Sequence, residues 1–294
     1  MEDELFVLVY QLICQERNKR KRRSRTQYSD WVILLVYFWS VAHDRPTDWA
    51  CQRRHWPTCW RWLSLPSQPT MSRRLRSLSV IQLLMSLMQR LQQVHEPHLP
   101  PEPLVRRLDS RPLVVGGFSK DRDARRGYAT GGKARGYKSF DLTGSAVVPD
   151  QLILGPLNQA DQEAAVELIR QLSGGGYLLA DCQYDNNDLH ALAGARGYQL
   201  ISPRRQPGTG LGHCAHNTGR LRSIDLLEGP GVFGRSVYRL REDIERRYGN
   251  CSSFGGGLQP LPSWVRRPHR VGMWLWAKHI LNGLRICINK GLAA

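Results

Sequence analysis

The chain of 294 residues carries 42 lysines and arginines against 25 aspartates and glutamates, a formal net charge of +17, and 41% of its residues are hydrophobic. This length and apolar content suffice for one large or two unequal folded domains, and they exclude a disordered tail. The excess of positive charge favours a polyanion such as DNA or RNA as partner, with an anionic membrane or a ribosome as the alternatives.

The cysteines and the apolar stretches indicate a cytoplasmic protein. There are seven cysteines, an odd and scattered set that favours reduced thiols. The opening MEDELFVLVY lacks the basic and then apolar order of a secretory signal. The longest apolar stretch, from Trp31 to Ala42, is shorter than the ~20 residues that span a bilayer, so we expect a buried helix there and no membrane partner.

Residues 1–94 are predicted to form a small all-helical domain. A helix is expected up to about Glu16, a second from Ser29 or Asp30, and a third from about Val80 to Leu91. Between the last two, RPTDWACQRRHW and QPTMSRRLRSLSV each place Pro and Thr or Ser ahead of a short amphipathic segment. Residues 95–104 hold four prolines and no periodicity, and they are predicted to be a linker.

Two basic segments of this domain are candidates for DNA contact. LPSQPTMSRRLRSL resembles the second half of a helix-turn-helix, in which Arg73, Arg74 and Arg76 reach phosphates or base edges. The alternative is a basic, solvent-facing surface on a helix bundle. The run from 17 to 25, RNKRKRRSR, is expected to bind a nucleic-acid backbone without sequence preference. The tryptophans at 49, 56, 60 and 62 are expected to be core residues.

Residues 105–294 have a mixed α/β pattern. The first expected elements are a strand in LVRRLDSRPLVVGG and a hairpin of two strands in GYKSFDLTGSAVVPDQLILG. A helix follows, which Asp161 is placed to cap. After it we expect the strand GYLLAD, the helix NDLHALAGARG and the strand YQLISP. A loop is expected at 204–235. Apolar residues at 237, 240, 244 and 248 then predict a helix, and a last amphipathic helix spans roughly 268–288.

Three acids stand at unusual places in this pattern. Asp109 interrupts the first predicted strand, Asp181 ends the strand GYLLAD, and Glu245 follows Ile244 on the late helix. Because adjacent strands lie about 4.8 Å apart, acids on neighbouring strands and on a helix packed over them can converge. Converging carboxylates beside a basic surface fit divalent metal ions and phosphodiester chemistry. Each acid also has an alternative: Asp181 as a turn cap, Asp109 on an edge strand, Glu245 on a solvated helix face.

Three blocks of sequence, covering most of residues 104–288, carry a family resemblance. The first is LDSRPLVV with ARGYKSFDLTG, and the second is GPLNQADQEAAVELI with LLADCQYDNNDLHALAGARGYQLISPRR. The third is YRLREDIERRYGN, with Tyr238, Arg241 and Glu245 at the spacing Tyr, two residues, Arg, three residues, Glu, followed by VGMWLWAKHILNGLR. The chain thereby resembles the DDE transposases of bacterial insertion sequences, in the four/five superfamily, whose catalytic domain has a ribonuclease H-like fold.

The resemblance implies a fold and a catalytic site. The fold is a ribonuclease H-like mixed sheet flanked by helices over residues 105–294, preceded by the helical DNA-binding domain. Asp109, Asp181 and Glu245 are the implied triad, holding two Mg²⁺ or Mn²⁺ ions that activate water to cut DNA at the element's end. The freed 3′-hydroxyl then attacks target DNA.

The resemblance also implies the contacts with DNA. Tyr238 and Arg241 are expected to contact the strand near the cut, and Lys138 the backbone. The family signature continues six residues beyond its Glu to a Lys, where this chain has Ser252. Arg246 or Arg247 is expected to take over that phosphate contact.

The implied partners are double-stranded DNA, as terminal inverted repeats and as target, and a second copy of the chain, because two DNA ends must be held together. The implied location is the bacterial cytoplasm, at the nucleoid. Two alternatives remain open. One is a catalytically inactive, transposase-derived DNA-binding protein, which the departure at Ser252 favours. The other is a ribonuclease H-like nuclease without strand transfer.

Overall fold

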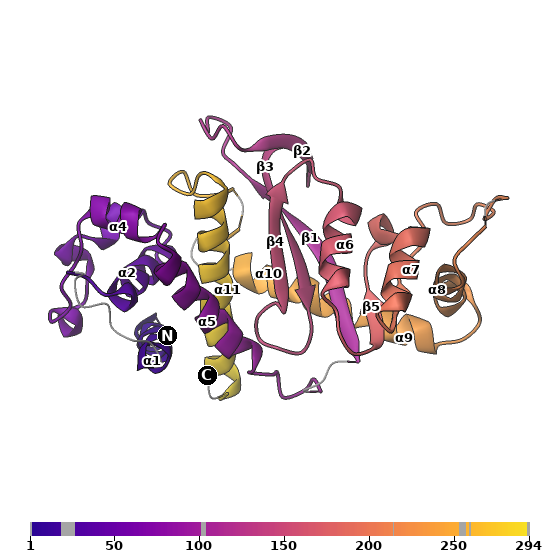
Figure 1. Ribbon diagram of the computed structural model, residues 1–294, viewed down its shortest axis with the longest axis horizontal. Coiled ribbons are helices and arrows are strands. Elements are labelled where there is room, and N and C mark those ends of the chain that lie inside the picture. Colours follow the sequence, from indigo (N-terminus) through magenta and orange to yellow (C-terminus); the bar gives the residue numbers. More distant parts are fainter. Residues whose placement is uncertain are drawn as a thin grey trace.

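A group of helices and a mixed sheet lie side by side, with the long helix α11 (Pro268–Lys290) running between them (Figure 1). The computed structural model describes residues 2–18, 27–100, 104–213, 215–252, 257–258 and 260–292. Most of the basic run 17–25 lies outside the described residues. In the part of the chain that is described, no helix is both long enough and apolar enough to cross a membrane.

The N-terminal helices follow the predicted pattern. The three long ones are α1 (Glu2–Asn18), α2 (Asp30–Ala42) and α5 (Leu78–Gln92). Between α2 and α5 lie α3 (Thr47–Ala50), two 3-10 turns (Arg53–His55 and Thr58–Trp60) and α4 (Gln68–Arg74). Because α2 is apolar around its whole circumference, it is buried from Val32 to Val41.

Aromatic rings fill the core between these helices. Phe6 of α1 makes edge-to-face contacts with Trp39, Trp56 and Trp60 at centroid distances of 4.7, 5.7 and 5.0 Å. The assignment of tryptophans to the core is wrong for Trp62, which is 54% exposed and contacts its neighbours with its ring at the surface. Its position after the last 3-10 turn puts it on the rim of the cluster rather than inside it.

The predicted mixed sheet is confirmed, with one additional strand. The strands are β1 (Val105–Val114), β2 (Arg125–Ala129), β3 (Gly132–Thr143), β4 (Gln151–Pro156), β5 (Gly176–Leu179) and β6 (Tyr198–Ile201). β3 pairs antiparallel with β1, β2 and β4, whereas β5 is parallel to both β1 and β6. The sequence did not predict β2, because RRGYA lacks an apolar alternation.

The two faces of the sheet are covered by different helices, as Figure 1 shows. Alternate residues such as Leu108, Phe140 and Leu178 pack against α6 (Asp161–Arg170) and α7 (Asn187–Ala195). The residues between them point to the opposite face. There α10 (Glu242–Ser252) and α11 pack, with Ile244 and Tyr248 of α10 in the same cluster as Leu113 of β1.

Two predicted elements differ from the structure. The expected loop at 204–235 contains α8 (Thr218–Glu228), whose start is capped by the Asn217 side chain accepting from the Gly219 amide at 2.8 Å. The single helix expected from position 237 is broken into α9 (Phe233–Arg239) and α10. At the break the Leu240 carbonyl accepts a hydrogen bond from the Arg107 guanidinium of β1, and Ile244 bonds back to the Arg241 carbonyl at 3.1 Å.

One hydrophobic cluster joins the N-terminal helices to α10 and α11. α11 packs on α1, α2 and α5 as well as on β4 and α10. Its Gly283 lies so close to Val148 that a Cβ there would stand 2.7 Å from Cγ1 of that valine, so only glycine permits this approach. The helical part and the sheet part therefore share α11 as a common wall.

Candidate active site

Asp109 and Asp181 lie at neighbouring positions on adjacent parallel strands. β1 and β5 pair with Arg107 opposite Leu179, and continuing that register by two residues brings Asp109 opposite Asp181. Aligned residues of parallel strands point to the same face, and the strands lie about 4.8 Å apart. Both carboxylates therefore belong to the face that α10 covers.

Asp181 also fills the role of a turn cap. It directly follows Ala180 at the end of β5, and its Oδ1 accepts a hydrogen bond from the Gln183 amide at 2.8 Å. The side chain thus caps the 3-10 turn Cys182–Tyr184, which is the alternative that the sequence left open. Capping occupies one carboxylate oxygen of Asp181 and leaves its second oxygen available to another group.

Glu245 and Arg241 come from the broken helix. The Arg241 guanidinium lies between two acids, with Nη2 3.3 Å from Oδ1 of Asp109 and Nη1 2.7 Å from Oε1 of Glu245. The Arg241 side chain is only 16% exposed, whereas Glu245 is 58% exposed. The break between α9 and α10 thus places a partly buried cation against the acid of β1, with Glu245 at its solvent side.

The other two acids act electrostatically on Asp109. Burial raises the pKa of Asp109 from 3.8 to about 6, with smaller contributions in the same direction from Asp181 and Glu245 and an opposing one from Arg241. Burial likewise raises the pKa of Asp181 above its ordinary value. Asp181 and Glu245 therefore both lie close enough to Asp109 to act on its charge.

Tyr238 ties α9 to the end of β5. Its hydroxyl donates to the Ala180 carbonyl at 3.2 Å, one residue before Asp181. Burial, together with the nearby acids, raises the pKa of Tyr238 to about 12 against the opposing effect of Arg241. The predicted residues Tyr238, Arg241, Asp109, Asp181 and Glu245 are therefore all gathered at this end of the sheet.

A fourth acid, which the sequence analysis did not single out, lies beside Asp109. Asp141 of β3 is directly opposite Asp109 in the antiparallel pair and is fully buried. Its carboxylate accepts from the Ser139 hydroxyl, and burial raises its pKa to about 7. The available signal was the same as for Asp109: an aspartate within a strand, where aspartate is disfavoured.

His279 of α11 lies behind this fourth acid. Its Nε2 is 3.6 Å from Oδ2 of Asp141, and both side chains are buried. Burial lowers the pKa of His279 to about 3, so the imidazole is neutral and the contact is not an ion pair at neutral pH.

Lys138 is not brought to the acids. It shares a face of β3 with Phe140, opposite to the face of Asp109 and Asp141. Its ammonium donates to the Gln159 carbonyl at 3.2 Å and lies 3.1 Å from Oδ1 of Asp161. Asp161 therefore pairs with Lys138 instead of capping α6, whose N-cap residue is Ala160.

The two arginines that follow Glu245 have different environments. Arg246 is 62% exposed and lies 3.1 Å from Asp243 in an i,i+3 pair. Arg247 is buried and donates to the Ala146 carbonyl at 2.7 Å, so it cannot reach a phosphate without leaving the core. The expectation that either arginine replaces the signature Lys therefore narrows to Arg246.

The arginines of α4 also differ. The Arg74 guanidinium donates to the Tyr28 carbonyl at 2.6 Å and to Asp30 at the start of α2 at 2.5 Å, so it holds α4 against α2. Arg73 and Arg76 are exposed. Arg76 lines a cleft of about 420 Å³ together with Arg266 and Arg270, near the start of α11.

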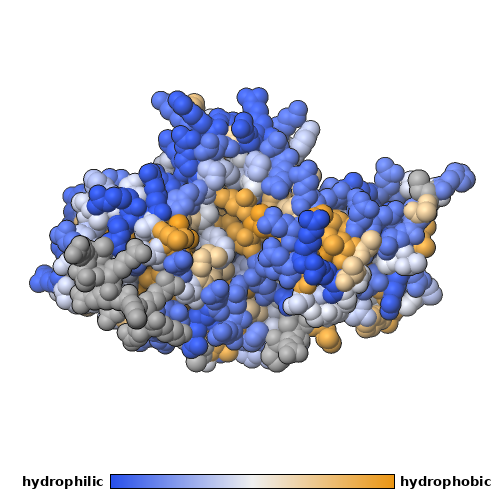
Figure 2. Space-filling model, viewed as in Figure 1, coloured by the Kyte–Doolittle hydropathy of each residue, from blue (hydrophilic) through white to orange (hydrophobic). Residues whose placement is uncertain are grey.

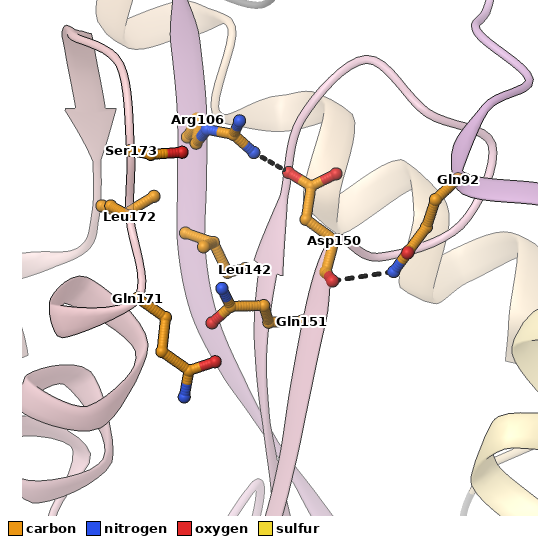
Figure 3. Close-up of a pocket in the computed structure, with 8 residues that line it drawn as sticks. All are labelled: Gln92, Arg106, Leu142, Asp150, Gln151, Gln171, Leu172 and Ser173. Carbon is orange, nitrogen blue, oxygen red and sulfur yellow. Dashed lines mark hydrogen bonds and ion pairs between the residues drawn. The ribbon is translucent and has the colours of Figure 1, made fainter. Parts of the chain in front are cut away.

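A second cavity, of about 240 Å³, lies at the start of β1 (Figure 3). Arg106 and Asp150 point toward each other across it and form an ion pair. Gln92 at the end of α5 donates to the Asp150 carbonyl at 2.7 Å. Because these polar groups satisfy one another, this cavity is a weaker candidate for chemistry than the acids at the other end of β1.

The site as it stands holds a positive side chain rather than a set of converging metal ligands. Across the described ranges, no three or more histidine, cysteine, aspartate or glutamate side chains are gathered closely enough to bind a metal ion. The donors themselves are carboxylate oxygens, which suit Mg²⁺ and Mn²⁺. Arg241 already provides one positive charge between two of the acids, so the site favours a cation.

Comparisons with known proteins find a likeness among solved structures but none among sequences. No protein-family model matches the chain, and no curated protein sequence matches it. Among solved structures, the chain is similar to a piggyBac transposase synaptic complex with hairpin DNA, with a TM-score of 0.45 and 11% identity over 98% of this chain and 76% of that one. At that TM-score and identity, the likeness alone establishes neither a shared fold nor a shared activity.

Proposed function

We propose that the protein is a DNA transposase with a ribonuclease H-like catalytic domain, which binds the ends of its insertion sequence and cleaves and joins DNA with Asp109, Asp181 and Glu245. The observation that carries the proposal is the register of β1 and β5, which sets Asp109 beside Asp181, together with the Arg241 bridge from Asp109 to Glu245. The sequence signature and the net charge of +17 support the same activity.

Asp109, Asp181 and Glu245 would hold two divalent ions, Mg²⁺ or Mn²⁺. When bound, the ions lower the pKa of the attacking water or 3′-hydroxyl and neutralise charge on the leaving oxygen. In this proposal Arg241 stands in for a cation in the free protein. Its guanidinium turns from the acids toward a DNA phosphate, for which its two-pronged donor geometry is suited.

The other residues of the site would position DNA. Tyr238, already anchored at the end of β5 beside Asp181, would pack on the strand near the cut. Arg246 is exposed one residue after Glu245 and would contact the backbone in place of the missing lysine. Lys138 would act only indirectly, because its ammonium is engaged by Asp161 on the other face of the sheet.

The helical domain, residues 1–94, would bind the terminal repeats, with the linker 95–104 leading to the catalytic domain at 105–294. Arg73 is exposed on α4 and is the base or phosphate contact in this proposal. Arg74 would keep α4 in place through Asp30. A homodimer on DNA would hold the two ends together for strand transfer.

The test is cleavage of a supercoiled plasmid that carries the element's ends, with Mg²⁺ or Mn²⁺ present. Asp109→Asn, Asp181→Asn and Glu245→Gln are each expected to reduce cleavage and strand transfer to background while DNA binding persists. Glu242→Gln is the matched control, because Glu242 is an exposed acid on the same helix and is expected to leave cleavage unchanged.

The products separate the possible functions. Strand-transfer products support the transposase. Cuts without joining, lost in the same three variants, indicate a nuclease with this site. DNA binding without any cut indicates an inactive derivative of a transposase, which Ser252 at the signature lysine position favours.

A further inference from the structure

A β-hairpin with its preceding loop projects from the sheet beyond the end of β1, at the top of Figure 1. We define residues 116–133, which comprise the loop after β1, all of β2 and the turn into β3, as the basic arm. The corresponding projection in Figure 2 is mainly hydrophilic. None of the family motifs in the sequence accounts for it.

The arm carries unneutralised positive charge. Its five exposed cations are Lys120, Arg122, Arg125, Arg126 and Lys133. In the described part of the chain, none of the five lies in an ion pair with a carboxylate. Five cations and two acids give the arm a formal charge of +3. Because both acids are engaged in contacts with the body, the positive charge that the arm exposes is larger than this formal value.

Those two acids fix the arm to the body. Asp121 is buried, and its Oδ2 accepts from the Tyr137 hydroxyl and from the Arg267 amide, both at 2.9 Å. Asp123 pairs with the Arg267 guanidinium at 3.0 Å. Arg135 of β3 donates to the Asp121 carbonyl at 2.6 Å. The arm is therefore anchored at its base, and its cations are presented from a fixed position.

Aromatic residues stand among the cations, exposed to solvent. Tyr128 is 74% exposed and Phe118 is fully exposed at 102%. Tyr128 and Lys133 are cross-strand partners, with the ammonium 5.9 Å from the ring centroid. Arg126 is two residues from Tyr128 and lies on the same face of the hairpin. Exposed aromatics interleaved with arginine and lysine are typical of surfaces that contact nucleic acid.

The arm follows the C-terminal end of β1, the strand that carries Asp109. From Asp109 to Val114 the strand runs for five residues, or about 17 Å, and the tip of the hairpin is about four residues further, so it lies roughly 30 Å from the acids. At 3.4 Å for each base pair, these distances correspond to about 5 to 9 base pairs of duplex.

We propose that the basic arm contacts the phosphate backbone of duplex DNA about 5 to 9 base pairs from the cleaved bond. The proposal rests on the proposed function for the position of the cut, whereas the binding contact itself does not depend on catalysis. The arm adds affinity without base specificity, because its charges are long, exposed side chains facing a backbone.

The test compares two double variants that each remove two positive charges. The arm variant is Arg126→Gln with Lys133→Gln. The control variant is Arg170→Gln with Arg196→Gln. Both arginines are exposed: Arg170 ends α6 and Arg196 directly follows α7, on the side where β5 and β6 begin, away from the acids. Affinity for a random-sequence duplex of about three helical turns, ~100 Å, is measured against salt concentration in EDTA, so that no cleavage occurs.

The arm variant is expected to bind on the order of tenfold more weakly at low salt, with a slope of log affinity against log salt that is smaller by about 2. The control is expected to keep the slope of the native protein within about 0.5. Equal slopes in the two variants would overturn the proposal, as would a loss confined to duplex RNA. Circular dichroism of each variant checks that its fold is retained.

Phosphate-ethylation interference on the cut DNA then locates the contact. Interference about 5 to 9 base pairs from the cleaved bond, absent in the arm variant, supports the placement. Interference at that position unchanged in the arm variant contradicts it. If no cleavage is found at all, the proposed function fails, while a reduced salt slope in EDTA still supports the arm as a DNA contact.

Discussion

Two carboxyls lie side by side across β1 and β3, Asp141 fully buried and Asp109 partly buried, and their surroundings stabilise the charged form to different degrees. Asp109 has the Arg241 guanidinium 3.3 Å away. Asp141 instead accepts from the Ser139 hydroxyl and lies beside the neutral imidazole of His279, and the more weakly acting Arg247 is the cation that favours its charged form. Ionisation of both would set like charges directly across a strand pair. Burial raises the pKa of both carboxyls, and Arg241 opposes that rise only at Asp109, so Asp109 is the one whose charged form is better supported.

Asp141→Asn is expected to stabilise the protein at alkaline pH. Because burial raises the pKa of Asp141 from 3.8 to about 7, the folded protein keeps a proton that the unfolded chain releases. The free energy of unfolding therefore falls as pH rises through this window, and asparagine removes that loss. Urea unfolding at pH 5 and pH 8 measures this effect. The unfolding free energy of the variant minus that of the native protein is expected to be larger at pH 8 than at pH 5 by on the order of 3 kcal/mol.

A control for this prediction is Asp225→Asn, which changes an exposed aspartate of α8. Its free energy of unfolding is expected to vary with pH as that of the native protein does. If Asp141→Asn follows the same pH dependence as this control, then Asp141 is ionised in the folded protein across the whole range, and the burial argument fails.

At the scale of elements, a buried arginine contacts the late helix at the point where it breaks. Arg107 of β1 donates to the Leu240 carbonyl and lies 2.5 Å from Oδ2 of Asp243, so it joins the sheet to the start of α10. The periodicity at 237, 240, 244 and 248 by itself predicts one helix, so this long-range contact accompanies the departure from the sequence pattern. At the break, Arg241 reaches Asp109, and this contact is part of the candidate site.

Arg107→Met is expected to cost about 1–3 kcal/mol of unfolding free energy, because it leaves the buried Gly144 carbonyl and the partly buried Asp243 carboxylate without their donor. In a double-mutant cycle with Asp243→Asn, the coupling energy is expected to exceed about 1 kcal/mol. Arg246→Met, which removes the exposed partner of Asp243, is the matched control and is expected to change stability by less than about 0.5 kcal/mol. A coupling energy near zero would mean that this ion pair does not join α10 to the sheet.

Periodicity and turn chemistry predicted most elements, and a few local features explain the failures. The sequence patterns predicted five of the strands and three of the helices of residues 105–294, namely β1, β3, β4, β5, β6, α6, α7 and α11. β2 was missed because RRGYA is held in place by pairing with β3 rather than by an apolar face. α8 was missed although Asn217 and apolar residues at helical spacing marked it within a loop rich in glycine and proline.

The candidate site was predictable only as a set of residue types at certain positions. The signature Tyr238, Arg241, Glu245 and the strand positions of Asp109 and Asp181 selected the residues that the structure gathers. Asp141 and Arg107 were not selected, because their roles arise from pairing across β1 and β3 and from contacts with α10. Such long-range contacts leave no periodic signal in a single sequence.

At the scale of the whole molecule, α11 connects parts that the sequence assigns to different domains. The cluster that contains Leu12 of α1 and Val36 of α2 also contains Trp274 and Ile280 of α11. Polar contacts reinforce this arrangement: the Lys290 ammonium lies 2.6 Å from Glu96, and His269 bonds the Leu75 carbonyl at 3.0 Å. In the proposed function, DNA bound by the helical part would therefore be held in a fixed position relative to the acids on the sheet.

Residues 105–294 expressed alone are expected not to fold cooperatively. Removing the first 104 residues exposes the face of α11 that packs on α1, α2 and α5, a loss of apolar burial that a marginally stable fold cannot absorb. Thermal unfolding of this fragment should show no sharp transition, and the fragment should bind a hydrophobic dye, whereas co-expression with residues 1–104 should restore both properties of the full chain. A fragment that unfolds cooperatively near the melting temperature of the intact protein would instead mean that α11 is fully supported by the sheet and α10, and that the two parts are independent domains in the thermodynamic sense.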